Sequence, residues 1–108
     1  MLNQKGMSDD KRSAPRVPNF TEVDCYAADG TGTPIPARMS DLSVTGAFID
    51  SVNTLPLGTK LALHFMAGQH ELLVGAEVVH AMPQFGMGVR FLNLTAEGRA
   101  AIEALIKG

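Results

Sequence analysis

Apolar residues alternate with polar ones in several short runs of this chain, and that spacing most limits what the chain can fold into. A period of two is typical of β-strands with one buried face, because successive side chains on a strand point to opposite sides. Eleven glycines and six prolines in 108 residues separate the runs and favour turns. The runs predict six strands: residues 20–27, 35–39, 47–51, 60–66, 71–82, and a last one in which Met87, Val89 and Phe91 alternate.

The period changes after the last of these runs. Ile102, Leu105 and Ile106 form one apolar stripe at helical spacing, with Thr95 as a candidate N-cap and Gly108 able to end the helix. A chain this short needs its strands closed on themselves, because open sheet edges pair with other chains. The sequence therefore predicts an all-β fold, a six-stranded antiparallel β-barrel with a C-terminal α-helix over one opening or face.

Positive charge is concentrated at the start of the chain. The first 20 residues carry four basic side chains against two acidic ones, whereas residues 21–108 carry five against nine. A basic segment with almost no apolar residues cannot bury enough surface to order itself. We therefore expect residues 1–11 to form a mobile N-terminal arm ahead of an acidic folded body.

Composition argues against several classes of function. A net charge of −2 and a pI near 5.8 do not suit a protein that coats a nucleic acid polymer. A barrel for single-stranded nucleic acid would need stacking aromatics on a basic face, but the chain has one Tyr and no Trp. No apolar run approaches the roughly 18 residues of a membrane span, so no membrane insertion is expected. The N-terminus has no apolar signal core, so the expected location is cytoplasmic.

The reactive residue types form no catalytic or metal-binding pattern in the sequence. Cys25 is the only cysteine, which excludes an internal disulfide and a multi-cysteine metal site. It lies in an apolar run without a patterned histidine base, so we interpret it as a small buried hydrophobe. His64, His70 and His80 lack the close spacing of a zinc site. We expect no enzymatic activity, no cofactor and no metal.

Two short groups remain as candidates for ligand chemistry. Arg12 and Arg16 form an R-x-x-x-R pair at the end of the basic segment, and residues 41–46 read D-x-S-x-x-G. Taken alone, the arginines are typical of a solvated tail, and the second group is typical of a tight turn. Their order and separation along one chain carry more information than either group by itself.

The combination resembles the PilZ domain family, bacterial receptors for the second messenger cyclic di-GMP. Members of that family carry R-x-x-x-R near the domain start and [D/N]-x-S-x-x-G a few tens of residues later. The resemblance continues in segments 46–49, 57–58 and 86–91, and so covers about residues 11–107. Ala47 is a departure, since many members carry a second glycine there, but alanine excludes little unless the backbone needs a positive φ. The resemblance implies a PilZ domain over residues 12–107.

The same resemblance implies where cyclic di-GMP binds. The implied ligand-binding residues are Arg12, Arg16, Asp41, Ser43 and Gly46, with Lys11 as a further contact or an influence on stoichiometry. These residue types suit the ligand, because guanidinium groups pair with phosphate and with the O6/N7 edge of guanine. A carboxylate in turn accepts from the guanine N1–H and N2–H₂ groups. Family members bind one ligand or an intercalated pair; a cation at Lys11 favours the pair but leaves the stoichiometry open.

The sequence therefore favours a non-enzymatic cyclic di-GMP receptor that changes conformation and regulates an unidentified effector protein. The resemblance implies that the arm closes over the bound ligand, and the new surface would recruit or release the partner. The alternative is a PilZ-like interaction module that binds no nucleotide and serves pilus or motility assembly through protein contacts. Whether the chain is a monomer or a dimer stays open.

Overall fold

The computed structural model describes residues 17–52 and 54–107, with side chains from residue 21 onward. The expected arm over residues 1–11 therefore lies outside the described residues. The same is true of Lys11, Arg12 and Arg16 from the candidate site, and of Gly108. The described part contains Asp41, Ser43 and Gly46.

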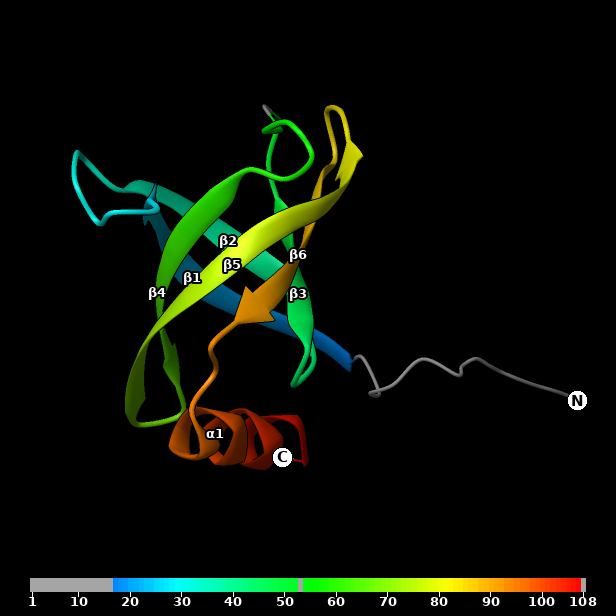
Figure 1. Ribbon diagram of the computed structural model, residues 1–108. Helices are drawn as coiled ribbons and strands as arrows, with labels where there is room; N and C mark the ends of the chain where they lie inside the picture. The colour runs from blue at the N-terminus through cyan, green and yellow to red at the C-terminus, as the bar shows by residue number, and fades with distance from the viewer. Residues whose placement is uncertain (1–16, 53, 108) are drawn as a thin grey trace, which may run out of the picture.

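Six antiparallel strands close into a barrel, followed by one helix (Figure 1). Around the barrel the strands follow the order β1-β2-β3-β6-β5-β4. The elements are β1 (Val17–Ala27), β2 (Ile35–Leu42), β3 (Gly46–Asp50), β4 (Lys60–Ala67), β5 (His70–Met82), β6 (Gly86–Leu92) and α1 (Ala96–Lys107). The predicted fold class is confirmed. Since the barrel is closed, each strand is paired on both sides over part of its length.

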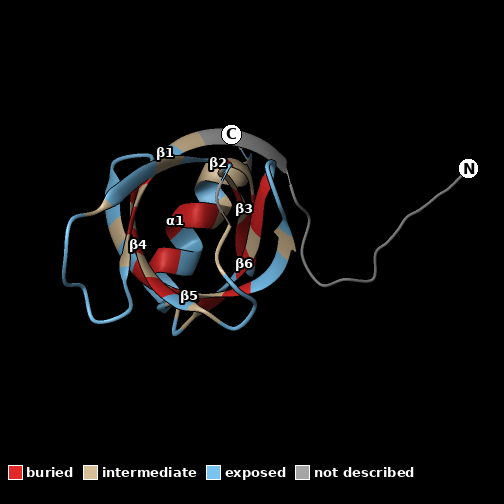
Figure 2. Ribbon diagram, turned by 90° about the horizontal axis from the view of Figure 1, so that it is seen from above, coloured by how far each residue is buried: buried red, intermediate tan, exposed pale blue. Residues whose placement is uncertain are grey.

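The interior of the barrel is built by the alternating residues. On β4 the predicted inward residues Leu61, Leu63 and Phe65 are all buried, and the Phe65 ring stacks on Phe91 of β6 with centroids 6.3 Å apart. Figure 2, a view along the barrel, shows buried residues distributed around the barrel wall. Cys25 is buried among them, and this desolvation, together with the charge of Asp24, raises the pKa of its thiol to about 11. A thiol so protonated at neutral pH is a poor nucleophile.

The helix α1 covers one end of the barrel (Figures 1 and 2). Thr95 caps it as predicted, since the Gly98 amide donates to Thr95 Oγ1 at 2.9 Å. Ile102 is fully buried, and Leu105 and Ile106 pack against the core as the apolar stripe predicts. Within the described residues, no helix has the length and apolar character needed to cross a membrane. At the opposite end of the barrel lies an apolar cavity of about 620 Å³, with Ile49, Leu61 and Met87 in its lining.

Strand β1 begins at Val17, earlier than the predicted start at residue 20. A strand would be expected to begin after Pro18, because proline cannot donate a hydrogen bond within a sheet. The first part of β1 pairs only with β2, whereas pairing with β4 starts at Val23, so the missing donor at Pro18 costs no ladder bond to β4. The pairing with β2 also shifts register between Pro18 and Thr21, an irregularity that accommodates proline.

Strand β2 continues to Leu42, past the predicted end at residue 39. Met39 and Leu42 are both fully buried although they are three residues apart, which breaks the period of two. The cause is a bulge: Met39 pairs with Ile49 and Asp41 with Phe48, so β2 carries one residue more than β3 between these pairs. Asp41 therefore belongs to the end of a strand, and only residues 43–45 form the turn to β3.

Candidate ligand-binding site

The turn between β2 and β3 is organised by the Ser43 hydroxyl. Ser43 is fully buried. Its Oγ accepts from the amides of Thr45 and Gly46 at 3.1 and 3.2 Å and lies 3.0 Å from Thr45 Oγ1. The Ser43 amide also donates to the Gly46 carbonyl at 2.9 Å. The serine of the D-x-S-x-x-G group thus holds the turn through contacts within the described chain.

Gly46 is required by close packing of two strands rather than by an unusual backbone angle. Its φ is not positive, but a Cβ placed on it would overlap the carbonyl oxygen of Val89 on β6. In the β3–β6 register Gly46 pairs with Arg90, and the Thr45 carbonyl accepts from the Phe91 amide at 2.8 Å. Glycine at this position therefore lets the turn approach β6. The neighbouring Ala47 is fully buried and has no positive φ, so alanine fits there.

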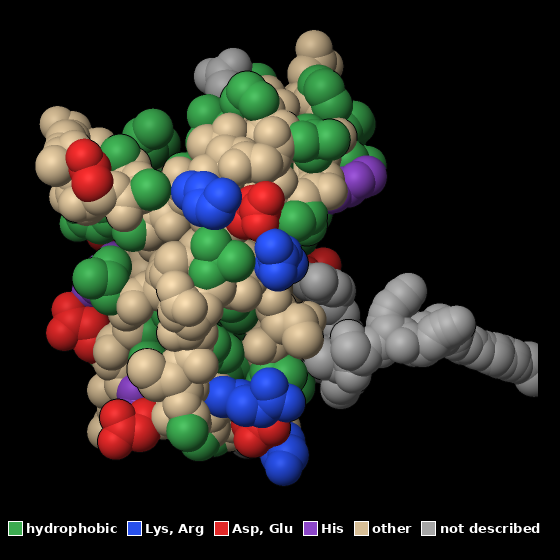
Figure 3. Space-filling model, in the orientation of Figure 1, with side chains coloured by type: hydrophobic (Ala, Val, Ile, Leu, Met, Phe, Trp, Pro, Cys, Tyr) green, Lys and Arg blue, Asp and Glu red, His purple; other side chains and the backbone are tan. Residues whose placement is uncertain are grey.

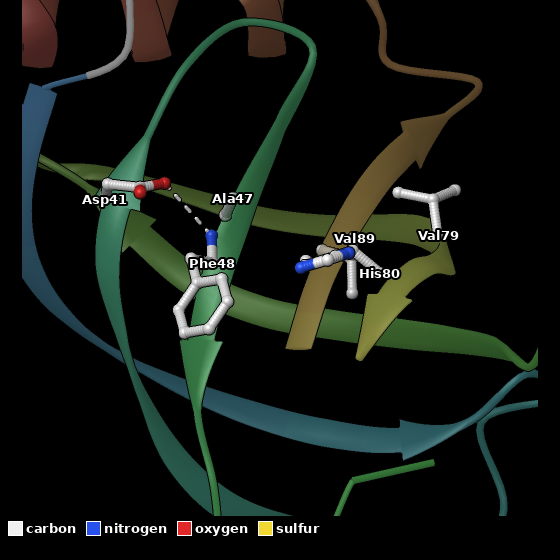
Figure 4. Close-up of a pocket in the computed structure, with 7 residues that line it drawn as sticks. Asp41, Ala47, Phe48, Val79, His80 and Val89 are labelled. Carbon is white, nitrogen blue, oxygen red and sulfur yellow. Dashed lines mark hydrogen bonds between the residues drawn. The ribbon is translucent and has the colours of Figure 1, made fainter. Parts of the chain in front are cut away.

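Asp41 lies on the outer face of the barrel, just before the turn. Its Oδ1 accepts from the Phe48 amide of β3 at 3.2 Å (Figure 4). The bulge in β2 turns this side chain outward while Met39 and Leu42 point inward. The hydrogen bond restricts the position of this carboxylate on the outer face of the sheet.

A shallow pocket of about 220 Å³ lies beside Asp41 on the outer face (Figure 4). Its lining comes from four strands: Asp41 of β2, Ala47 and Phe48 of β3, Gly88 and Val89 of β6, and Val79 and His80 of β5. Phe48, Gly88 and His80 were not among the candidate site residues of the sequence. No local spacing connects them to Asp41, because only the strand register brings them together.

Ion pairs surround this region of the barrel surface. Arg38 pairs with Asp50 across β2 and β3 at 3.0 Å, and Arg90 pairs with Glu77 across β5 and β6 at 2.7 Å. Figure 3 shows basic and acidic side chains next to one another on the face formed by β4, β5 and β6. Arg90 is two residues from Gly88 on the same strand face, so it places a cation near the pocket, partly balanced by Glu77.

The structure thus brings together part of the predicted set. Asp41 borders the outer pocket, whereas Ser43 and Gly46 form the turn that follows it. Arg12, Arg16 and Lys11 lie outside the described residues, so their role stays a prediction. Among the described residues no cluster of three or more His, Cys, Asp or Glu side chains could hold a metal ion.

The chain belongs to the PilZ domain family, because its sequence matches the family model of the PilZ domain over residues 10–108. That match covers both candidate motifs and all six strands. A comparison with curated protein sequences gave no match.

Several solved structures share this fold. The PilZ domain of CeSA from a cellulose-synthesising bacterium is 21% identical, with a TM-score of 0.64 over 87% of this chain and 96% of that one. The PilZ domain of Escherichia coli YcgR with cyclic di-GMP is 18% identical, with a TM-score of 0.69 over 91% and 90%. The Bacillus subtilis inhibitor of motility MotI (DgrA) is 15% identical, with a TM-score of 0.67 over 92% of this chain and 51% of that one. At these identities the likeness shows the fold.

The close approach of Gly46 to β6 leads to a prediction about stability. Gly46→Ala should lower the free energy of unfolding by about 1–3 kcal/mol, because its Cβ cannot fit without separating the turn from β6. Gly75→Ala on β5 is the matched control, since a Cβ there makes ordinary contact with Leu92 at 3.7 Å. Urea unfolding of both variants is the measurement. Equal stability of the two variants would show that the turn tolerates a side chain.

Proposed function

We propose that this chain is a non-enzymatic receptor for cyclic di-GMP, with Arg12, Arg16, Asp41, Ser43 and Gly46 forming its binding site. PilZ domains are regulatory ligand-binding modules, and two of the structural neighbours are complexes of YcgR with cyclic di-GMP. The observation that carries the proposal is the β1–β2 register, in which Pro18 pairs with Asp41. The described chain therefore starts, at Val17 and Pro18, beside the strand end that carries Asp41, and Arg16 is the residue that precedes Val17 in sequence.

Chain geometry supports joint action of the two motifs. Arg16 precedes Pro18 by two residues, which is at most about 7 Å of extended chain. A guanidinium at position 16 can therefore reach a ligand that lies against Asp41, and Arg12 is four residues before Arg16 in the sequence. Two guanidinium groups suit the two phosphates and the guanine faces of the ligand, because they form bidentate bonds and stack.

Asp41, Ser43 and Gly46 contribute to this site in different ways. The outward carboxylate of Asp41 is suited to accept from guanine N1–H and N2–H₂. Ser43 and Gly46 hold the turn that follows Asp41, which keeps the strand end and its carboxylate in position. Lys11 adds a further cation for the phosphates, and the stoichiometry would be one or two ligands per chain.

The output of such a receptor requires a second protein. We propose that the ligand orders the arm over the outer face of β2. A ligand bound to both the arginines and Asp41 would favour the conformation in which the arm lies against β2. The resulting surface would bind or release an effector in the cytoplasm.

A protein-interaction module that needs no nucleotide is the second candidate. The large apolar residues Ile35, Val52, Leu57, Met82 and Phe85 are exposed. They belong to the start of β2, the end of β5 and the β3–β4 and β5–β6 loops, which lie at the end of the barrel opposite α1 (Figure 1). Such surfaces often bind other proteins. A partner bound equally well with and without cyclic di-GMP would favour this candidate.

Titration calorimetry with cyclic di-GMP tests the receptor function. We expect binding to the full chain, and we expect Arg12→Ala and Arg16→Ala each to weaken it by about 1.5–3 kcal/mol, the contribution of charge-assisted hydrogen bonds. Arg99→Ala on α1 is the control, with unchanged affinity expected because Arg99 pairs with Glu103 on the helix. Absence of heat at high micromolar ligand would contradict the receptor function.

A separate substitution tests the part that Asp41 plays. Asp41→Asn keeps an oxygen that can accept from the Phe48 amide but replaces the other carboxylate oxygen with a donor. We expect weaker cyclic di-GMP binding with little change in the melting temperature of the free protein. If the melting temperature falls and the affinity does not, Asp41 serves the sheet and has to be removed from the site.

A further inference from the structure

Four residues form a row across the outer face of the barrel. In the strand registers Asp41 pairs with Phe48, Phe48 with Gly88, and Gly88 with His80. The row thus runs over β2, β3, β6 and β5, and all four residues line the same pocket (Figure 4). A carboxylate lies at one end of this pocket and an imidazole at the other.

Two bulges place the ends of the row on the same face. The bulge in β2 lies between Met39 and Asp41, and a second one in β5 lies between Val78 and His80. In β5 the extra residue is Val79, so Val78 is buried inside the barrel while both Val79 and His80 are exposed. Bulges often occur next to binding sites because they change the direction of a side chain. Here they direct Asp41 and His80 to the same pocket.

Gly88 leaves the floor of the pocket open between these two side chains. A Cβ at Gly88 would contact the His80 Cβ at 3.3 Å, with no other described atom within 4 Å of it outside its chain neighbours. The Phe48 ring does not fill this space, because it lies against Gly86, where a Cβ would collide with it. The backbone at Gly88 is therefore uncovered, with the Asp41 carboxylate at one side of it and the His80 imidazole at the other.

The dimensions suit a planar base. Asp41 and His80 are three strand spacings apart, about 14 Å along the sheet. A carboxylate, one hydrogen bond and a purine together span most of this distance. Imidazole rings, like other aromatic side chains, stack on the faces of bases.

We propose that His80 is a further ligand-binding residue, whose imidazole stacks on the guanine that Asp41 holds, across the slot left open by Gly88. This assignment rests on the proposed binding of cyclic di-GMP and extends its site from β2 to β5. It also gives Gly88 a function, because any side chain there would occupy the place of the base.

Calorimetry with cyclic di-GMP on the full chain tests the assignment. His80→Ala should weaken binding about tenfold, whereas His80→Phe, which keeps a stacking ring, should bind within about twofold of the wild type. Gly88→Val should weaken binding at least tenfold because it fills the slot. His70→Ala is the control with unchanged affinity, since His70 is an exposed histidine at the other end of β5. Melting temperatures of the free variants verify that each one folds.

Each outcome decides the assignment. Binding by the wild type with no loss in His80→Ala overturns the role of His80 and leaves the proposed function standing. Equal losses in His80→Ala and His80→Phe would show a hydrogen bond instead of stacking and overturn the stacking assignment. No loss in a folded Gly88→Val variant would show that the slot is unused. If Gly88→Val does not fold, the two His80 variants decide. No binding by the wild type overturns both the proposed function and this assignment.

Discussion

The extra residue that β2 carries opposite β3 determines the geometry of the whole candidate site. Without the bulge, a strict alternation from Met39 would turn Asp41 into the barrel, where an unpaired carboxylate is costly. With it, Met39 and Leu42 both fill the core and Asp41 faces the outer pocket. One irregularity thus reconciles a closed apolar interior with a charged group at the surface. The pairing of Pro18 with Asp41 then brings the start of β1 to the same place.

The residues of the D-x-S-x-x-G group differ in what they contact. Ser43 is fully buried and its hydroxyl serves the amides of its own turn, while Gly46 permits contact with the β6 backbone. These two residues give the turn its shape, and the turn fixes the end of β2 that carries Asp41. All three residues of a short motif can therefore be needed to position one outward side chain, although only that side chain faces the outer surface.

Much of the fold could be predicted from local patterns, and the limits of that prediction have physical causes. The structure confirms the features that depend on residues close in sequence: the alternation on β4 and β6, the Thr95 cap and the apolar stripe on α1. The ends of β1 and β2 were missed because register shifts break the period on which the prediction rests. Nothing in the sequence indicated that His80 and Gly88 line a pocket with Asp41, because they are far from it in sequence and close only through three strand pairings. The arginine pair was found through its spacing, and its role stays a prediction.

The proposed ligand site lies on the outer face of β2, β3, β6 and β5, beside Asp41. Amide chemical-shift mapping of the ¹⁵N-labelled chain on addition of cyclic di-GMP tests it most directly. We predict that the largest changes among residues 17–107 fall on Asp41, Phe48, Gly88 and His80, which line one pocket. Changes concentrated instead at His64 and Leu73, which line a groove near β4 and β5, or at the apolar cavity opposite α1, would contradict the account.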